Sequence, residues 1–388
     1  MSIQEPQWDA QFQDAADWEA LETTMAARAA LKHQPLGATF ELTPFCNLRC
    51  KMCYVRLEKE QAVKIGRMLT ADEWISLADD TLKAGTLNLL LTGGEPLSRP
   101  DFAEIYTALS DRPFVLSLNT NAALMDAETQ ALFCKRPPSS IAVTLYGACP
   151  ETYGKICGDP GAFERTLRGL EMLAEVPTSL EVRTTFIQDN MHELDALREI
   201  AARYTKRFAI NVNVFKPIRG ATADVESCRL TARQAMDLDT AHRQYYKARQ
   251  KSGLSPKEPA TTPKKGKYTG FDLPPKVLTC MAAKGMYWLS WDGRMLPCGT
   301  FSHPYTQPLK EGFDAAWQRL PTLYEDLRLP EKCEHCEIDL LGCPNCPANI
   351  QAESGNFTDV PPYICALAKE RAQRLGNLKT GSTRHHTE

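Results

Sequence analysis

The sequence has no long hydrophobic run and no marked excess of charge of either sign. None of its apolar stretches approaches the roughly 20 residues that a membrane-spanning helix requires. Its first 20 residues are acidic and lack the basic and then apolar segments of a secretory signal, which predicts a cytoplasmic protein. The 45 basic and 48 acidic residues give a net charge of −3, so nothing favours nucleic acid or an anionic membrane as a partner.

Cysteine, in contrast, is abundant, with 14 in the 388-residue chain. A chain of this length without an export signal is not expected to build a disulfide framework, so closely spaced cysteines are more typical of metal ligands. Ten of the 14 lie in such clusters. The others are predicted to be small, buried hydrophobic residues. They are Cys134, Cys149, Cys157 and Cys228.

Short β-type runs alternate with amphipathic helical patterns, which predicts an α/β fold. The β runs are 38–43, 87–93, 114–120, 141–147, 180–187 and 208–215. Helical patterns lie at 70–85, opened by a capping box of Thr70 and Glu73, and at 161–176. Successive βα units indicate a parallel sheet, but periodicity alone leaves open whether it is an incomplete barrel or doubly wound. In both folds, ligands bind at the carboxyl ends of the strands.

Composition divides the chain into segments. We expect a polar leader at 1–37 with a helix at about 15–31, an α/β core at 38–249 and a cysteine-rich region at 277–370. The stretch 250–276 is rich in Pro, Lys, Thr and Gly, which predicts a linker. The end of the chain, 371–388, is expected to be a flexible tail.

The first cysteine cluster follows the first β run, where Cys46, Cys50 and Cys53 are spaced C-x3-C-x2-C. Three thiolates on one short loop can each ligate a different iron of a cubane cluster. The fourth iron then keeps an open position for a ligand, as catalytic zinc sites do. The alternative is a three-cysteine zinc loop with a remote fourth ligand.

The second β run ends in the sequence TGGEP, which contains Gly93, Gly94, Glu95 and Pro96. Two glycines at a strand end allow the backbone to approach a ligand closely. The Glu95 carboxylate can accept hydrogen bonds from an ammonium group. Taken alone, the glycine pair also fits a simple turn.

Together, the CNLRCKMC loop and the GGEP segment resemble the radical SAM superfamily. The resemblance implies a partial (β/α)6 barrel of the TIM type and a catalytic [4Fe-4S] cluster on the three cysteines. The cluster would bind S-adenosylmethionine (SAM) and generate a 5′-deoxyadenosyl radical. Met52 and the backbone around Tyr54 would contact the adenine, and Gly93 to Pro96 would bind the methionyl amine.

Further strand ends offer weaker candidates. By the same resemblance, Asn119, Thr144 and Arg183 would complete the cofactor site, with Thr144 and Arg183 contacting the ribose and carboxylate of SAM. An arginine suits a carboxylate because its fork donates two hydrogen bonds, although a structural salt bridge for Arg183 remains open. Arg219, after the sixth run, is a candidate for substrate contact.

The C-terminal cysteines resemble the SPASM extension of radical SAM enzymes, although the block C-x2-C-x6-C-x2-C departs from the family spacing on each side of Cys343. The resemblance implies two auxiliary [4Fe-4S] clusters. The ligands of the first would be Cys280, Cys298 and Cys346. Those of the second would be Cys333, Cys336, Cys343 and Cys365. A zinc ribbon is the alternative, but its cysteine pairs usually stand farther apart.

SPASM enzymes commonly modify peptides or proteins, so the resemblance implies a peptide-maturing radical enzyme that forms thioether or carbon–carbon crosslinks or related oxidations. Oxidation of a Cys or Ser side chain, as in sulfatase maturation, is a second possibility. An iron–sulfur or zinc protein that only transfers electrons or supports a partner is the non-catalytic alternative. The expected partners are a peptide or protein substrate, an electron donor such as flavodoxin or ferredoxin, and a separate peptide-recognition protein.

Overall fold

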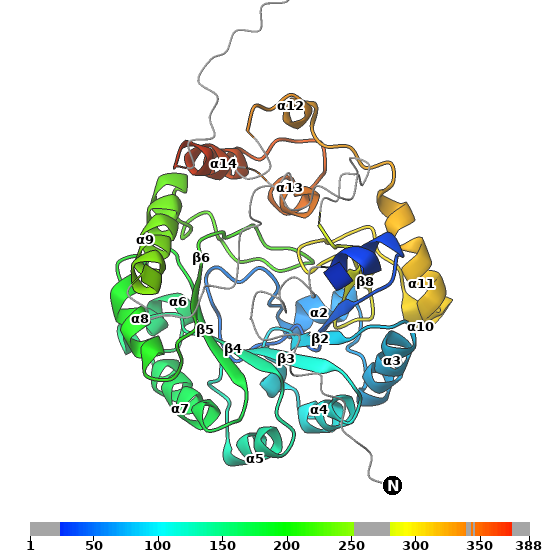
Figure 1. The fold of residues 1–388 in the computed structure, drawn as a ribbon, viewed down its shortest axis with the longest axis horizontal. Helices are drawn as coiled ribbons and strands as arrows, with labels where there is room; N and C mark the ends of the chain where they lie inside the picture. Colours follow the sequence, from blue (N-terminus) through cyan, green and yellow to red (C-terminus); the bar gives the residue numbers. More distant parts are fainter. Residues whose placement is uncertain (1–23, 252–279, 339–342, 344–345, 375–388) are drawn as a thin grey trace, which may run out of the picture.

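The computed structural model describes residues 24–251, 280–338, 343 and 346–374, and its centre is one eight-stranded sheet (Figure 1). The strands are β1 (Gly37–Glu41), β2 (Asn88–Thr92), β3 (Val115–Thr120), β4 (Ser140–Thr144), β5 (Ser179–Thr185), β6 (Phe208–Asn211), β7 (Met286–Leu289) and β8 (Met295–Leu296). Their order is β6-β5-β4-β3-β2-β1-β7-β8. All six predicted β runs are therefore confirmed as strands.

This order decides between the two folds that the sequence left open. Strands β1 to β6 are parallel and follow one another across the sheet in chain order. A doubly wound sheet would reverse direction at a switch point. The sheet instead curves inside a ring of helices, as in an incomplete barrel (Figure 1). The predicted (β/α)6 barrel is confirmed.

Two strands were not predicted. Strand β7 pairs in parallel with β1, and β8 pairs antiparallel with β7. Both come from the cysteine-rich region that the sequence assigned to a separate segment. The first part of that region thus extends the sheet of the core.

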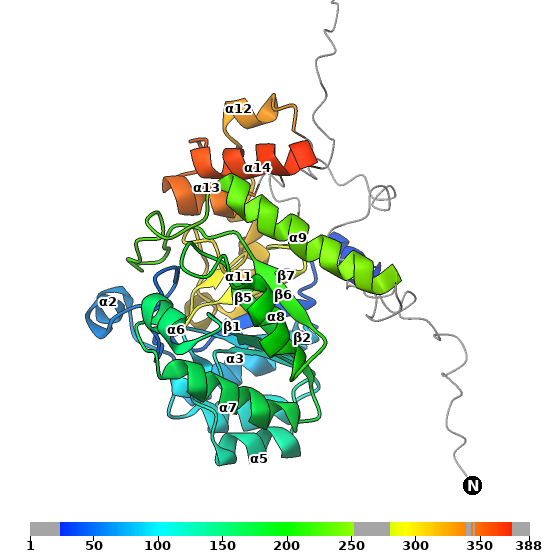
Figure 2. The ribbon, with the colours of Figure 1, turned by 90° about the vertical axis from the view of Figure 1, so that its left-hand side faces the viewer.

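A ring of helices that includes α3, α4, α5, α7 and α8 covers the outer face of the sheet (Figure 1). The bounds of the helices are α2 (Lys59–Ile65), α3 (Ala71–Lys83), α4 (Phe102–Ser110), α5 (Ala127–Lys135), α6 (Pro150–Cys157), α7 (Ala162–Ala174), α8 (Leu194–Ala202), α9 (Ala232–Lys251), α10 (Pro308–Glu311), α11 (Phe313–Arg319), α12 (Glu331–Glu334), α13 (Pro347–Ser354) and α14 (Pro362–Arg374). The last three lie together at one end of the molecule, and α14 packs against α9 (Figure 2). Among the described residues, no helix has the length and apolar character that crossing a bilayer requires.

Strand residues alternate between the helices and the barrel interior. On β1, the Phe40 ring lies 5.0 Å from the ring of Trp74 on α3, so Phe40 faces outward. Its neighbour Glu41 therefore faces inward. The capping box at the start of α3 is formed as predicted, because the Glu73 amide donates to Thr70 Oγ1 and the Thr70 amide donates to the Glu73 carboxylate.

Several sequence predictions fall wholly or partly outside the described residues. Residues 24–31 are helical, in line with the predicted N-terminal helix at about 15–31. The first part of that predicted helix lies outside the described residues. So do nearly all of the predicted linker and most of the predicted tail.

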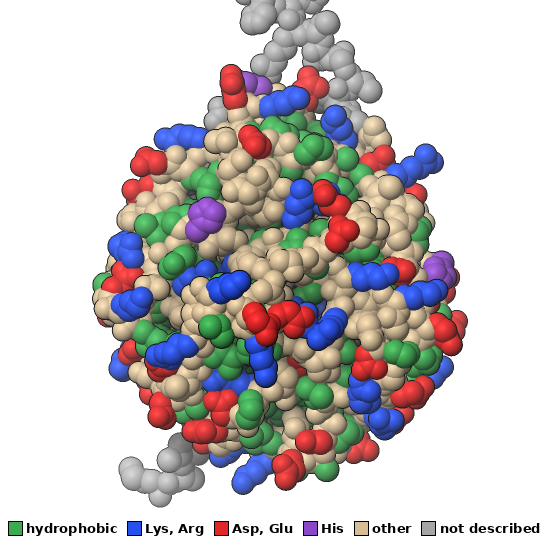
Figure 3. Space-filling model, turned by 180° about the vertical axis from the view of Figure 1, so that it is seen from behind, with side chains coloured by type: hydrophobic (Ala, Val, Ile, Leu, Met, Phe, Trp, Pro, Cys, Tyr) green, Lys and Arg blue, Asp and Glu red, His purple; other side chains and the backbone are tan. Residues whose placement is uncertain are grey.

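On the face opposite to the view of Figure 1, basic, acidic and apolar side chains are interspersed (Figure 3).

Candidate metal and cofactor site

The loop after β1 carries the three closely spaced cysteines at the carboxyl edge of the sheet. Backbone amides point at two of the sulfur atoms: Leu48 N lies 3.4 Å from Cys46 Sγ, and Arg56 N lies 3.3 Å from Cys53 Sγ. The Cys53 amide donates to the Cys50 carbonyl, which closes the loop. Hydrogen bonds to sulfur are one of the means by which proteins tune iron–sulfur clusters.

The three thiols form one group. Burial raises the pKa of Cys53 to about 11, and the neighbouring Cys50 thiolate raises it further. Burial also raises the pKa of Cys46, with smaller contributions from Cys50 and Cys53. No three His, Cys, Asp or Glu side chains in the described part of the chain converge closely enough to hold one metal ion. A cubane takes each thiolate on a different iron, and three cysteines on one loop are the kind of donor set that such a cluster uses.

The glycines of the GGEP segment contact the backbone of the cysteine loop. A Cβ atom on Gly94 would lie 2.2 Å from the carbonyl oxygen of Phe45, and one on Gly93 would lie 2.7 Å from that of Thr43. The Gly94 amide donates to the Thr43 carbonyl at 2.7 Å. Two glycines are thus required here because two backbone segments meet.

The Glu95 carboxylate is buried beneath this contact, with 1% of the residue exposed. It accepts hydrogen bonds from Thr120 Oγ1 at 2.7 Å, from the Asn121 amide at 2.7 Å and from the Leu97 amide at 3.0 Å. Burial raises the pKa of Glu95 to about 7, against the lowering effect of these donors. Glu95 therefore connects the GGEP segment to the end of β3, and its contact with a methionyl amine stays a prediction.

The other predicted residues of this loop are also placed. Met52 is buried among core side chains, and Pro96 opens a short 3₁₀ turn that is Pro96–Ser98. The Tyr54 carbonyl accepts a hydrogen bond from the Ile218 amide at 2.9 Å. The predicted contacts of Met52 and Tyr54 with adenine remain predictions.

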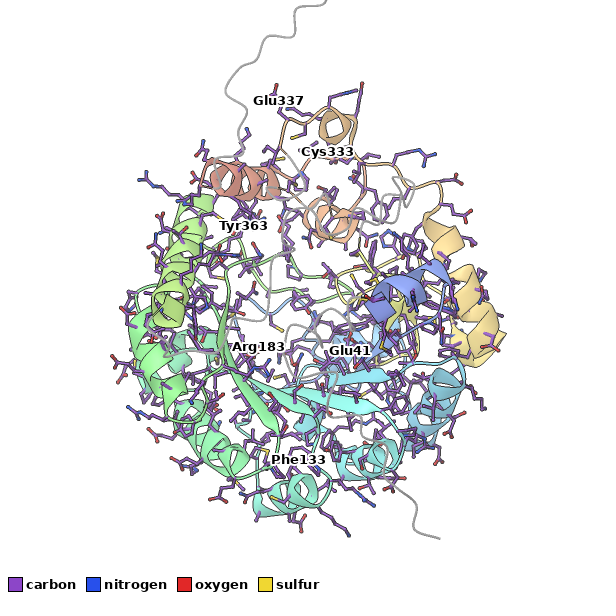
Figure 4. All side chains as sticks on the ribbon, viewed as in Figure 1. Glu41, Phe133, Arg183, Cys333, Glu337 and Tyr363 are labelled. Atoms are coloured by element: carbon purple, nitrogen blue, oxygen red, sulfur yellow. The ribbon has the colours of Figure 1, made fainter. Side chains whose placement is uncertain are left out.

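The remaining predicted cofactor residues come together on the inner face of the sheet. Thr144 on β4 pairs in register with Arg183 on β5. Arg183 Nη1 lies 3.5 Å from Asn119 Oδ1 on β3, and its guanidinium also forms an ion pair with Glu181. The Arg183 side chain, which lies within the ring of helices in Figure 4, is 49% exposed and so remains accessible to a ligand.

Arg219 does not lie at an open mouth, where the sequence placed it. Its side chain is 2% exposed and forms an ion pair with Glu41 at 2.7 Å. It also donates to the carbonyls of Gly299 and Phe301. These contacts occupy the guanidinium, which contradicts the predicted contact with substrate. Gly299 and Phe301 lie 80 and 82 positions later in the chain than Arg219, so no local pattern could have indicated these contacts.

Three further residues, outside the predicted cofactor set, contact the cysteine loop. The pKa of Cys50 is raised mainly by a hydrogen bond with Cys157. Tyr146 donates to the same thiol and opposes this rise. Asn121 Nδ2 lies 3.7 Å from Cys46 Sγ and 2.8 Å from Asn47 Oδ1. Asn121 and Tyr146 each follow a strand end, which is the signal that could have identified them.

A cleft of about 360 Å³ opens beside Cys50 and Cys53. Basic residues of the loop and the segment after β6 line it. The loop contributes the basic residues Arg49, Lys51 and Arg56, and the segment after β6 contributes Thr222 and Asp224. The cysteine loop is thus reachable from outside the barrel.

The C-terminal cysteines separate into two groups. Burial raises the pKa of Cys346 to about 11, with further contributions from the nearby Cys298 and Cys280 thiolates. Burial likewise raises the pKa of Cys333, with contributions from Cys365, Cys343 and Cys336. Cys333 lies on α12, away from the barrel (Figure 4). The thiols within each predicted set thus influence one another, and their assignment to two auxiliary clusters stays a prediction.

Comparison with known proteins agrees with this geometry. Residues 40–217 match the family model described as the radical SAM superfamily. An AdoMet-dependent heme synthase of Methanosarcina barkeri is 28% identical over 86% of this chain and 97% of its own length. A PqqA peptide cyclase of Granulibacter bethesdensis is 26% identical over 86% of this chain and 88% of its own.

Two solved structures share the fold. The Streptococcus suis protein SuiB bound to its precursor peptide SuiA has a TM-score of 0.63 and 15% identity, and covers 90% of this chain and 81% of its own. Native anSMEcpe with bound AdoMet and the Kp18Cys peptide has a TM-score of 0.66 and 15% identity, and covers 89% of this chain and 99% of its own.

Proposed function

Because the chain belongs to the radical SAM superfamily, we propose that it is an enzyme that abstracts hydrogen from a peptide or protein and so modifies it. The modification would be a thioether or carbon–carbon crosslink, or a related oxidation. Relatives named PqqA peptide cyclase, which match most of the chain, support a peptide substrate. Peptide-bound structures with the same fold are consistent with it.

The observation that carries the proposal is the packing of the cysteine loop against Gly94 and above the buried Glu95. Cys46, Cys50 and Cys53 would hold a [4Fe-4S] cluster with one open iron. When bound, that cluster supplies the electron that cleaves SAM to a 5′-deoxyadenosyl radical. A protein that only carries electrons gains nothing from an open iron, which argues against the non-catalytic alternative.

The protein's own residues would position the cofactor and exclude water. The inward-facing Asn119, Thr144 and Arg183 would bind its polar groups, with the arginine suited to the carboxylate. The auxiliary cysteines would hold two more [4Fe-4S] clusters, and an electron donor such as flavodoxin or ferredoxin would reduce the protein. Such chemistry suits the reducing cytoplasm.

The test is anaerobic incubation of reconstituted protein with SAM and dithionite, followed by chromatography for 5′-deoxyadenosine. Formation of 5′-deoxyadenosine is expected, and its absence from protein with a full iron content would refute radical SAM activity. Candidate peptides, encoded by short reading frames beside the gene, are then added. A crosslink would appear in mass spectrometry as the loss of two hydrogens.

Relatives named AdoMet-dependent heme synthase favour a second candidate substrate, an iron porphyrin precursor of heme. The same assay distinguishes the two. Stimulation of 5′-deoxyadenosine formation by the porphyrin, together with conversion of the porphyrin and no effect of any peptide, would select this candidate. A peptide that loses two hydrogens would select the first.

A further inference from the structure

An ion pair is buried at the carboxyl edge of the sheet, between the core and the cysteine-rich region. Arg219 Nη2 lies 2.7 Å from Glu41 Oε2, and the two side chains are 2% and 1% exposed. Trp288 of β7 donates its indole N–H to the same carboxylate oxygen at 2.7 Å. The mechanism proposed above uses none of these groups.

Arg219 also contacts the segment that follows Cys298. Its Nη1 donates to the Gly299 carbonyl at 2.6 Å and to the Phe301 carbonyl at 3.1 Å. These two bonds fix the backbone directly after a cysteine of the predicted three-cysteine group. Since both carbonyls accept from one guanidinium, a displacement of Arg219 would displace the Cys298 segment as well.

The backbone beside Arg219 contacts the other cysteine site. The Ile218 amide donates to the carbonyl of Tyr54, the residue after Cys53. Arg219 itself has a φ of 50°, in the left-handed region that few side-chain-bearing residues adopt. One turn thus contacts the first cysteine loop through its backbone and the Cys298 segment through a side chain.

Charge matters in this position because the pair lies between two thiolate-rich sites. The potential of an iron–sulfur cluster depends on nearby charge and on hydrogen bonds. A buried cation favours the more negative, reduced cluster, and a buried carboxylate opposes that effect. Burial raises the pKa of Glu41 and Arg219 lowers it, so the ionised pair depends on the arginine.

We propose that Arg219 and Glu41 are a positioning pair that holds the Cys298 segment against the first cysteine loop and sets the reduction potential of the iron–sulfur site at Cys298. The role rests on the proposed auxiliary cluster at Cys280, Cys298 and Cys346. Arg219 supplies the hydrogen bonds and the positive charge. Glu41 orients the guanidinium and compensates that charge.

The first arm of the test changes the charge. Glu41→Gln keeps a group of similar shape that accepts from Trp288 but leaves the Arg219 charge uncompensated. We expect the midpoint potential of the auxiliary cluster, measured by redox titration with electron paramagnetic resonance (EPR) detection, to rise. The double variant Glu41→Gln/Arg219→Gln removes both charges and also the two carbonyl hydrogen bonds, so the potential should fall below that of Glu41→Gln while the iron content at the Cys298 site decreases.

The second arm changes the geometry. Arg219→Lys keeps the charge but cannot donate to both carbonyls as a planar fork does, so we expect less iron at the Cys298 site or an altered EPR line shape. Arg99→Lys is the matched control. Arg99 is buried, pairs with Asp101 and donates to the carbonyls of Leu42 and Leu69, each at 2.6 Å, all within the core.

The control should lose stability without changing the auxiliary signal. An unchanged potential in Glu41→Gln with normal iron and line shape in Arg219→Lys, or an equal effect in Arg99→Lys, would show that the pair is only structural. Cys298→Ala identifies the auxiliary signal. If Cys298→Ala loses no iron signal, the auxiliary cluster and this role are both refuted. Formation of 5′-deoxyadenosine by the wild type still reports separately on the proposed radical SAM activity.

Discussion

Replacement of Gly94 by alanine tests the contact on which the cysteine loop depends. The new Cβ atom would lie 2.2 Å from the carbonyl oxygen and 2.5 Å from the carbonyl carbon of Phe45. Both are backbone atoms, so no side-chain rotation relieves the overlap. The loop and the GGEP segment would have to separate. That movement breaks the hydrogen bonds from Gly94 N to Thr43 O at 2.7 Å and from Glu95 N to Phe45 O at 2.8 Å.

The expected loss of stability follows from these contacts. Overpacking a close-packed interior costs about 1–3 kcal/mol. Each lost hydrogen bond adds about 0.5–1.5 kcal/mol, so Gly94→Ala should lower the free energy of unfolding by about 2–6 kcal/mol. Because Cys46 follows Phe45 directly, the displacement should also move a cluster ligand, and the iron content of the reconstituted protein should fall.

Gly37→Ala is the matched control, since its Cβ would meet only Met286 Cβ at 3.8 Å, an ordinary contact. Chemical denaturation under anaerobic conditions and iron analysis provide the two measurements. Gly37→Ala should bind the wild-type amount of iron. Stability within about 0.5 kcal/mol of the wild type and a full iron content in Gly94→Ala would refute the argument.

Further predictions concern individual side chains. Cys50→Ala should abolish both the SAM-site EPR signal and 5′-deoxyadenosine formation. Cys134 is exposed, so the control variant Cys134→Ala should retain both. Burial lowers the pKa of His242 to about 4, so the unfolded chain binds its proton more readily and stability should fall as the pH drops below about 6.5. At pH 5 the free energy of unfolding should be about 2 kcal/mol lower than at pH 7. Denaturant unfolding of the wild type and of His242→Phe at both pH values measures this, and the variant should show no such loss. Arg229 donates to both carboxylate oxygens of the buried Glu353 at 2.9 Å. Arg229→Met therefore leaves that carboxylate without its cation. It should destabilise the protein by about 3 kcal/mol, whereas an effect below about 1 kcal/mol would place the pair with ordinary surface salt bridges.

The predictable part of the fold is the part with local periodicity. All six predicted strands and both named helical patterns are present, because short β-type runs and apolar spacing of three to four residues reflect burial within each element. Strand β7 was missed for the opposite reason. It has only four residues, and its partner β1 lies about 250 positions earlier in the chain, so no local pattern records the pairing.

The site divides in the same way. Cysteine spacing identified the loop at the carboxyl edge of the sheet, and the grouping of the C-terminal cysteines that the family resemblance implied stays a prediction. The position of Arg219 after a strand predicted an accessible side chain, but Gly299 and Phe301 cover it. Glu41 offered a usable signal, because a carboxylate within an otherwise hydrophobic strand must find a buried partner.

The contacts of the segment after β6 determine how the cysteine-rich region should be regarded. This segment connects to that region at two separate points, through Arg219 to the backbone after Cys298 and through Arg229 to Glu353 on α13. Strand β7 adds a third connection along β1. A barrel truncated after α9 would expose the edge of β1, remove Glu353 from Arg229 and remove the two carbonyls to which Arg219 donates. We therefore predict that a chain truncated after α9 is less stable than the full chain in chemical denaturation, and equal stability of the two chains would refute this view.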